Sequence, residues 1–156
     1  MTARRTVIGV MGAGVCDEPT ADLAREVGRL VAERSAVLLC GGGGGVMEAA
    51  AEGAAQAGGL TVGVMPGRDA TESRPNAHVQ LALFTGLGDA RNYVNVCASD
   101  AIIAIAGSWG TLSEIALARK VGKPVVLVRS WSLDADLPAA ESAEDAVDMA
   151  FAALER

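Results

Sequence analysis

Three short apolar runs in this chain each lead into a glycine-rich turn, and this repeated pattern limits the possible folds more than any other feature of the sequence. The runs cover residues 7–10, 36–39 and 101–105, and they consist mainly of Val, Ile, Leu and Ala. Runs this short and this apolar are typical of strands buried on both faces of a parallel sheet. Because parallel strands need a crossover connection between them, a helix is expected after each turn.

The rest of the chain continues this alternation. Apolar residues spaced at i, i+4, i+7 and i+8 after Pro19 indicate a helix with one buried face. Other elements are expected as strands at residues 60–65, 79–83 and 124–128, and as helices over residues 89–97 and 141–154. With 156 residues the chain is expected to form one domain, residues 1–156. The predicted fold is α/β: a single doubly wound, Rossmann-like domain with a mostly parallel sheet of six to seven strands.

The charge balance excludes a nucleic-acid-binding surface. The chain carries 13 Lys and Arg against 19 Asp and Glu, a formal net charge of −6, whereas binding to nucleic acid depends on Lys and Arg that neutralise phosphates. No run approaches the roughly 20 apolar residues that cross a bilayer, so we expect no membrane contact and a cytoplasmic location. Because the chain as a whole is acidic, any site that binds an anion must be formed by a local group of residues.

Cysteine and histidine are too few and too scattered for common metal chemistry. Cys16, Cys40 and Cys97 are widely spaced, which is typical of reduced thiols in the cytosol. His78 is the only histidine, so neither a zinc site of ordinary spacing nor a Ser-His-Asp triad is expected. We predict no metal site.

The glycine-rich turns predict a binding site for a phosphate group. In an open α/β sheet, ligands bind at the carboxyl ends of the strands, and glycine lets backbone N–H groups at a helix N-terminus approach an anion. Neither a complete dinucleotide fingerprint nor a Gly-Lys-Ser/Thr phosphate loop is present. The alternative is that the glycines only permit tight turns and close packing. The candidate phosphate-binding residues are Gly12, Gly14, Gly42, Gly43, Gly44, Asn92, Gly107, Ser108, Gly110 and Thr111.

Two charged residues, Arg91 and Glu114, are candidates for contact with the ligand. Arg91 lies in the first turn of a helix that Asp89 is expected to cap, where a cation faces the positive end of the helix dipole. That placement indicates a ligand anion nearby or, alternatively, an ion pair with Asp89. Glu114 can project its carboxylate into the same crevice, but it can also form a capping box with Thr111 as the N-cap residue.

Two loops are expected to lie near the site. Residues 67–78 are polar and unperiodic, and we predict that they form a lid. Trp109 can stack on a base, but a tryptophan before a helix is more often a packing residue, so packing is the favoured interpretation. Trp131 lies in a second loop, residues 130–140, where contact with a neighbouring subunit is an equal alternative.

Three segments together resemble the LOG family, whose members are often mislabelled lysine decarboxylase. The segments are residues 41–48, 90–92 and 106–114, and their order and spacing match the family across nearly the whole chain. The family motif reads Pro-Gly-Gly-x-Gly-Thr-x-x-Glu. This resemblance implies a Rossmann-like fold, a homodimer or higher homo-oligomer, and a phosphoribohydrolase that cuts the N-glycosidic bond of a nucleoside 5′-monophosphate.

The same resemblance implies roles for individual residues. Gly107, Gly110 and Thr111 would hold the 5′-phosphate, and Arg91 and Glu114 would be the catalytic pair. In such a reaction a carboxylate stabilises the oxocarbenium-like ribosyl centre and positions water, while an arginine holds phosphate or ribose oxygens.

Three departures from the motif are similar to a shorter branch of this superfamily, which includes the molybdenum-cofactor carrier proteins. Ala106 stands at the motif proline, Ser108 at its second glycine, and Asn92 at the lysine that normally follows the arginine. Those carriers bind a phosphate-bearing pterin. The expected partner is therefore a small phosphorylated ligand, and no cofactor is expected to be required. The ligand is an AMP-like nucleotide that the protein hydrolyses. Alternatively, the protein holds the molybdenum cofactor, or senses a nucleotide, without turnover.

Overall fold

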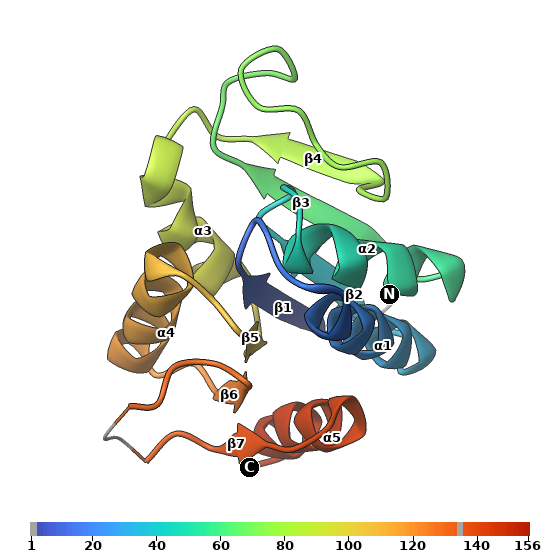
Figure 1. The fold of residues 1–156 in the computed structure, drawn as a ribbon, viewed down its shortest axis with the longest axis vertical. Helices are drawn as coiled ribbons and strands as arrows, with labels where there is room; N and C mark the ends of the chain where they lie inside the picture. Colours follow the sequence, from blue (N-terminus) through green and yellow to red (C-terminus); the bar gives the residue numbers. More distant parts are fainter. Residues whose placement is uncertain (1–2, 134–135) are drawn as a thin grey trace.

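The structure, a computed structural model that describes residues 3–133 and 136–156, is a single α/β domain built on one parallel sheet (Figure 1). The seven strands lie in the order β4-β3-β2-β1-β5-β6-β7, and every described pair is parallel. The strands are β1 Val7–Gly12, β2 Val37–Cys40, β3 Thr61–Met65, β4 Leu81–Phe84, β5 Ala101–Ile105, β6 Val125–Val128 and β7 Ala139–Ala140. The helices are α1 Glu18–Glu33, α2 Val46–Gln56, α3 Arg91–Ala98, α4 Trp109–Val121 and α5 Ala143–Leu154, with a short 3-10 turn η1 at Gly88–Ala90.

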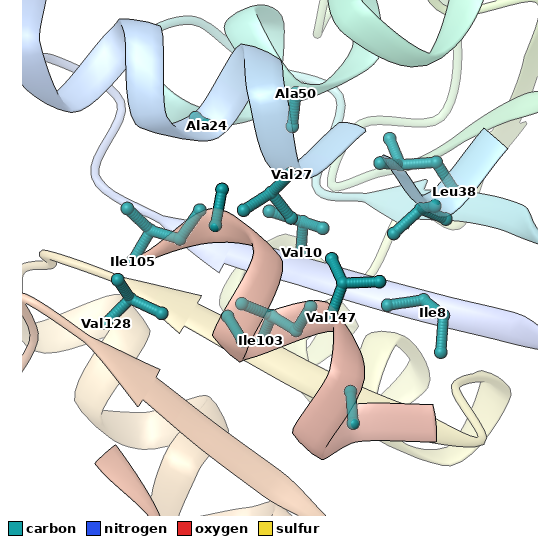
Figure 2. Close-up of a cluster of buried hydrophobic side chains, with 14 of the residues drawn as sticks. Ile8, Val10, Ala24, Val27, Leu38, Ala50, Ile103, Ile105, Val128 and Val147 are labelled. Atoms are coloured by element: carbon teal, nitrogen blue, oxygen red, sulfur yellow. The ribbon is translucent and has the colours of Figure 1, made fainter. Parts of the chain in front are cut away.

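Helices cover both faces of the sheet, which confirms the predicted doubly wound α/β fold. Figure 1 shows α1, α2 and α5 on one face and α3 and α4 on the other. In β5, Ile103 and Ile105 pack in the first layer, whereas Ile102 and Ala104 pack in the second. Because successive side chains of a strand point to opposite faces, a continuous apolar run can fill both layers. Figure 2 shows the first layer, where helix residues such as Val27 and Val147 lie over β1, β2, β5 and β6.

Some element boundaries differ from the sequence prediction. The fourth strand is Leu81–Phe84 rather than residues 79–83, because the side-chain hydroxyl of Thr61 binds the chain just before it, donating to the carbonyl of His78 and accepting from the N–H of Gln80. The last helix begins at Ala143 rather than at residue 141, because Ser142 caps it by accepting from the N–H of Asp145.

The order of the strands places a crevice beside β1. From β1 the chain moves outward to β2, β3 and β4, and it then returns to form β5 on the other side of β1. The loops that follow β1 and β5 therefore leave the sheet in opposite directions at its carboxyl edge. In open α/β sheets this reversal of strand order is where ligands bind.

Helices α1 and α2 pack so closely that Gly53 has no room for a side chain. A Cβ at Gly53 would lie 1.8 Å from the carbonyl oxygen of Arg25 on α1. The obstacle is backbone of a packed helix, so it cannot move aside as the end of a flexible side chain can.

We expect Gly53→Ala to lower the free energy of unfolding by about 2–3 kcal/mol. In an unhindered helix the same change would raise it, because alanine has the higher helix propensity. Gly110→Ala is the matched control, since Gly110 is helical and the nearest atom to its added Cβ would be 3.9 Å away. Urea unfolding of both variants tests this, and equal stability of the two would contradict the close approach of α1 and α2.

Candidate functional site

A cavity of about 160 Å³ lies in the crevice at the carboxyl edge of the sheet. It collects residues from the loops after β1, β2 and β5 and from the first turn of α3. Its lining consists of Met11, Gly12, Gly14, Gly41, Met47, Asp89, Arg91, Asn92, Ser108, Gly110, Thr111 and Glu114. The structure thus brings both candidate catalytic residues and most of the candidate phosphate-binding residues around one space.

Four predicted residues lie outside this lining, and two of them support it from behind. Gly107 underlies Thr111, because a Cβ at Gly107 would lie 2.6 Å from the Cβ of Thr111. Gly42 covers Met65, whose sulfur would be 2.2 Å from an added Cβ. These two glycines therefore allow close packing beneath the cavity. For them the alternative interpretation holds, in which glycine serves packing and does not contact the ligand.

The other two, Gly43 and Gly44, line a separate cavity together with part of the polar loop 67–78. Asn76 of that loop donates its backbone N–H to the carbonyl of Gly42 at 2.9 Å and its side-chain Nδ2 to the carbonyl of Gly43 at 2.8 Å. Within the described part of the chain, no residue of this loop lines the first cavity. In this structure the loop braces the glycine turn and lies outside the lining of the first cavity, so its role as a lid stays a prediction.

The turn after β5 has a backbone that the motif proline could not adopt. Ala106 has φ +49° and Gly107 has φ +127°, both in the left-handed region, whereas proline is held near −65°. The hydroxyl of Ser130 donates to the carbonyl of Ala106 at 2.5 Å. The path of this loop therefore excludes proline at position 106, where the backbone N–H also donates to the carbonyl of Val128.

Helix α4 begins before Thr111, which the capping-box interpretation had placed at the N-cap position. Its first residue is Trp109, and Ser108 is the N-cap residue. Thr111 is therefore the third residue of the helix and Glu114 the sixth, so the predicted capping box between them is wrong. The left-handed turn at Ala106 and Gly107 starts the helix before Thr111 can cap it.

The N-terminus of α4 offers hydrogen-bond donors to the cavity. The first N–H groups of a helix have no partner within the helix, and the side chain of Ser108 makes no capping hydrogen bond. Thr111 is almost fully buried, and its Oγ1 has no partner among the residues that the structure describes. Together with the positive end of the helix dipole, these groups favour a bound anion.

Arg91 supplies a cation at the opposite wall. Its Nη1 donates to Oδ1 of Asn92 at 3.0 Å, while its buried Nε has no partner in residues 3–133 and 136–156. The guanidinium lies directly over Gly41, where an added Cβ would be 2.4 Å from Nη1. No ion pair joins Arg91 to Asp89 among the described residues, so the alternative of an Arg91–Asp89 pair is wrong.

Asp89 also does not cap the helix that carries Arg91. The residues before this helix form the 3-10 turn η1, and α3 starts at Arg91 with Ala90 as its N-cap residue and no side-chain capping bond. The predicted single helix from Asp89 is therefore divided. Asp89 instead forms part of the cavity lining.

Glu114 is the buried acid of the site, with 5% of its surface exposed. Burial raises its pKa from the ordinary value of 4.5 to about 7, although a hydrogen bond from Asn95 and the charge of Arg91 both act to lower it. The Nδ2 of Asn95 donates to Oε1 of Glu114 at 2.8 Å, and Oδ1 of Asn95 has no partner in the part of the chain that the structure describes. Near neutral pH this carboxyl is therefore shared between its neutral and charged forms.

Asn95, which binds the buried acid of the site, was not predicted from the sequence. It is completely buried on α3, four positions after Arg91, and therefore lies on the same helix face. That spacing is the signal that could have identified it. Asn92, by contrast, links the two helices of this face: its Nδ2 donates to Oγ of Ser113 at 3.1 Å.

Trp109 differs from the favoured packing interpretation, whereas Trp131 packs against the core. Trp109 is 76% exposed at the start of α4. Its ring centroid lies 5.2 Å from that of Trp131, with the planes tilted by 40°. Trp131 is half-buried and donates its Nε1 to the carbonyl of Ser108 at 3.2 Å. One tryptophan is therefore anchored, while the other presents an aromatic face to solvent.

The described residues show neither a membrane-spanning helix nor a cluster of metal ligands. Outside residues 1–2 and 134–135, no helix has the length and apolar character that a membrane span needs. Over the same residues, no three His, Cys, Asp or Glu side chains gather as metal ligands do.

Comparison with known proteins gives consistent matches. A family model described as the SLOG cluster4 family matches residues 5–153. An uncharacterized protein of Archaeoglobus fulgidus is 42% identical over 141 residues, which cover 90% of this chain and 91% of that protein.

Solved structures match over almost the whole chain. The molybdenum cofactor binding protein of the phototrophic bacterium Rippkaea orientalis is 37% identical with a TM-score of 0.91, covering 98% of this chain and 99% of the other. The molybdenum cofactor carrier protein of Chlamydomonas reinhardtii is 34% identical with a TM-score of 0.86, covering 98% of this chain and all of the other. These matches confirm the predicted resemblance to the short LOG-like branch.

Proposed function

Because this chain belongs to the SLOG cluster4 family, we propose that it is a carrier that holds a phosphorylated pterin of the molybdenum-cofactor type and releases it unchanged. The likeness in sequence and fold to two proteins named for that cofactor supports this proposal. It is the alternative that the sequence analysis left open beside hydrolysis.

One observation carries the proposal: residues whose hydrogen-bond donors lack partners in residues 3–133 and 136–156 line a phosphate-sized cavity. The donors are Nε of Arg91, the hydroxyl of Thr111 and the first N–H groups of α4. A phosphate group offers several strong acceptors, and a guanidinium matches them well. A buried donor without a partner is costly, so a ligand that supplies acceptors is strongly favoured.

The size of the cavity limits which part of the ligand it can hold. Sites that enclose a whole drug-sized ligand are about 300–1,000 Å³, whereas this one is about 160 Å³. It therefore suits the phosphate of the ligand, and the rest of the molecule must lie outside it.

Hydrolysis of a nucleoside 5′-monophosphate is the second candidate, favoured by one specific observation. Arg91 and Glu114 line the same cavity, as the family resemblance requires of the catalytic pair. A carboxyl with a pKa of about 7 suits proton transfer near neutral pH. This reading predicts release of free adenine from AMP.

The two candidates are separated by measurements on the purified protein. A carrier from molybdenum-replete cells should contain a pterin, detected by its fluorescence after denaturation and oxidation, and should release no adenine from AMP. Release of adenine that Glu114→Gln abolishes, while Arg119→Ala on the exposed end of α4 retains it, would establish the hydrolase instead. Absence of pterin together with no heat on titration with ribose 5-phosphate would remove both.

A further inference from the structure

We propose that the groove between α3 and the start of α4 receives the planar ring of the ligand, with Trp109 as its stacking surface. This inference rests on the proposed function, because it assigns a place to the part of the ligand that the phosphate cavity cannot hold.

The groove adjoins the phosphate cavity. It has a volume of about 480 Å³, and it shares Asp89, Asn92 and Gly110 with the cavity lining. Three other cavities in the described part of the chain share no lining residue with the phosphate cavity. A molecule whose phosphate lies beneath α4 can therefore extend directly into this groove.

The walls of the groove suit an aromatic ring. Trp109, Tyr93 and Leu117 contribute its apolar surface, and Trp109 and Tyr93 are 76% and 49% exposed. Large aromatic side chains carry much apolar area, and exposed ones at a concave surface are typical of ligand contacts. Trp109 also rests on Trp131, which is anchored through Ser108, so one of its faces is supported and the other is free.

The polar rim of the groove suits a ring with N–H donors. Asp89 is the only charged residue among those that line it, and an ionised carboxylate is an acceptor only. Pterins and guanine both carry an amino group and a ring N–H on one edge, which can donate to such a carboxylate. GMP is therefore a suitable probe, since it joins this ring edge to a phosphate, and ribose 5-phosphate is the same probe without the ring.

The test compares these two ligands by calorimetry in wild type and Trp109→Ala. We expect the variant to bind GMP about tenfold more weakly than wild type, a loss within the range usual for one stacked base. Its affinity for ribose 5-phosphate should stay within twofold of wild type. Trp109→Phe should restore most of the GMP affinity, because it keeps an aromatic face. Val121→Ala, which removes an exposed apolar side chain from the other end of α4, should leave both affinities unchanged.

A second measurement does not depend on removing Trp109. In Trp131→Phe, Trp109 is the remaining tryptophan, and its fluorescence should be quenched by GMP but not by ribose 5-phosphate.

The outcomes distinguish this inference from the proposed function. Equal GMP affinity in wild type and Trp109→Ala, with ribose 5-phosphate still bound, overturns the ring site alone. The same equality combined with a smaller oligomer for Trp109→Ala in sedimentation would assign the groove to a second copy of the chain. Failure of both ligands to bind wild type would overturn the phosphate site, and the ring site with it.

Discussion

Replacing Arg91 with alanine should lower the affinity of the protein for ribose 5-phosphate about a hundredfold. Arg91 is the only cation that lines the described cavity, and its Nε has no protein partner there. A hydrogen bond to a charged group contributes about 1.5–3 kcal/mol, and about 2.7 kcal/mol corresponds to a hundredfold change in affinity. The substitution also leaves only the acidic side chains of Asp89 and Glu114 as ionisable groups in the described lining, so no cation would remain there to attract an anion.

The variant Arg91→Lys separates charge from geometry. Lysine keeps the positive charge but lacks the planar fork of donors, so its affinity should fall between those of wild type and the alanine variant. Arg119→Ala serves as the control, because Arg119 is exposed near the end of α4 and does not line the cavity. Calorimetry at fixed ionic strength measures all four proteins. An affinity within threefold of wild type for Arg91→Ala would show that the phosphate lies elsewhere.

Replacing Glu114 with glutamine should stabilise the folded protein above neutral pH. The pKa of Glu114 is raised from 4.5 to about 7 in the folded state. Protonation of Glu114 therefore favours the folded state. Its contribution to the free energy of unfolding is fully present below pH 4.5. It is lost as the pH rises from 4.5 to 7, because the folded protein must then ionise a buried acid. The difference amounts to about 3 kcal/mol.

Glutamine avoids this loss for a geometric reason. Its amide keeps an oxygen that can accept from Nδ2 of Asn95, and it adds N–H donors for the Oδ1 of Asn95 that has no partner in the described residues. Arg91 on α3 is the charged neighbour that favours the ionised form of Glu114, and the charge of Glu114 in turn acts to raise the pKa of the buried Cys40 thiol on β2.

Urea unfolding at pH 5 and at pH 8 checks the prediction. Glu114→Gln should exceed wild type by about 3 kcal/mol at pH 8 and by much less at pH 5. Glu155→Gln, an exposed position after α5, should follow the wild-type pH dependence. A pH-independent difference between Glu114→Gln and wild type would show that Glu114 does not titrate between these values.

The elements predicted from the sequence agree best with the structure where the prediction rests on residues close together in the chain. Buried strands read as continuous apolar runs, and β5 at Ala101–Ile105 lies where its run predicts. Arg91 and Glu114 were also identified from the sequence, Arg91 as a cation in the first turn of a helix and Glu114 as a carboxylate just after the glycine turn of residues 107–111. Their convergence on one cavity follows from the parallel sheet, since all carboxyl ends of parallel strands share one edge.

The helix starts were harder to predict because more than one capping pattern is compatible with the same residues. Ser108 and Thr111 are both good N-cap residues, and the choice between them depends on the backbone path of Ala106 and Gly107. That path is set by contacts with the neighbouring strand β6, where the N–H of Ala106 donates to the carbonyl of Val128.

What the sequence determined by itself was the alternation of strands and helices, the glycine-rich edge and the identity of its charged residues, because these depend on short-range spacing along the chain. Only the tertiary structure decided which glycines face the cavity, since the five glycines from Gly41 to Gly45 are alike in sequence and differ in what packs against them. It also decided the pairing of Asn95 with Glu114, which joins residues 19 positions apart on two helices. Such contacts follow from how α3 and α4 pack together, and no local pattern encodes that packing.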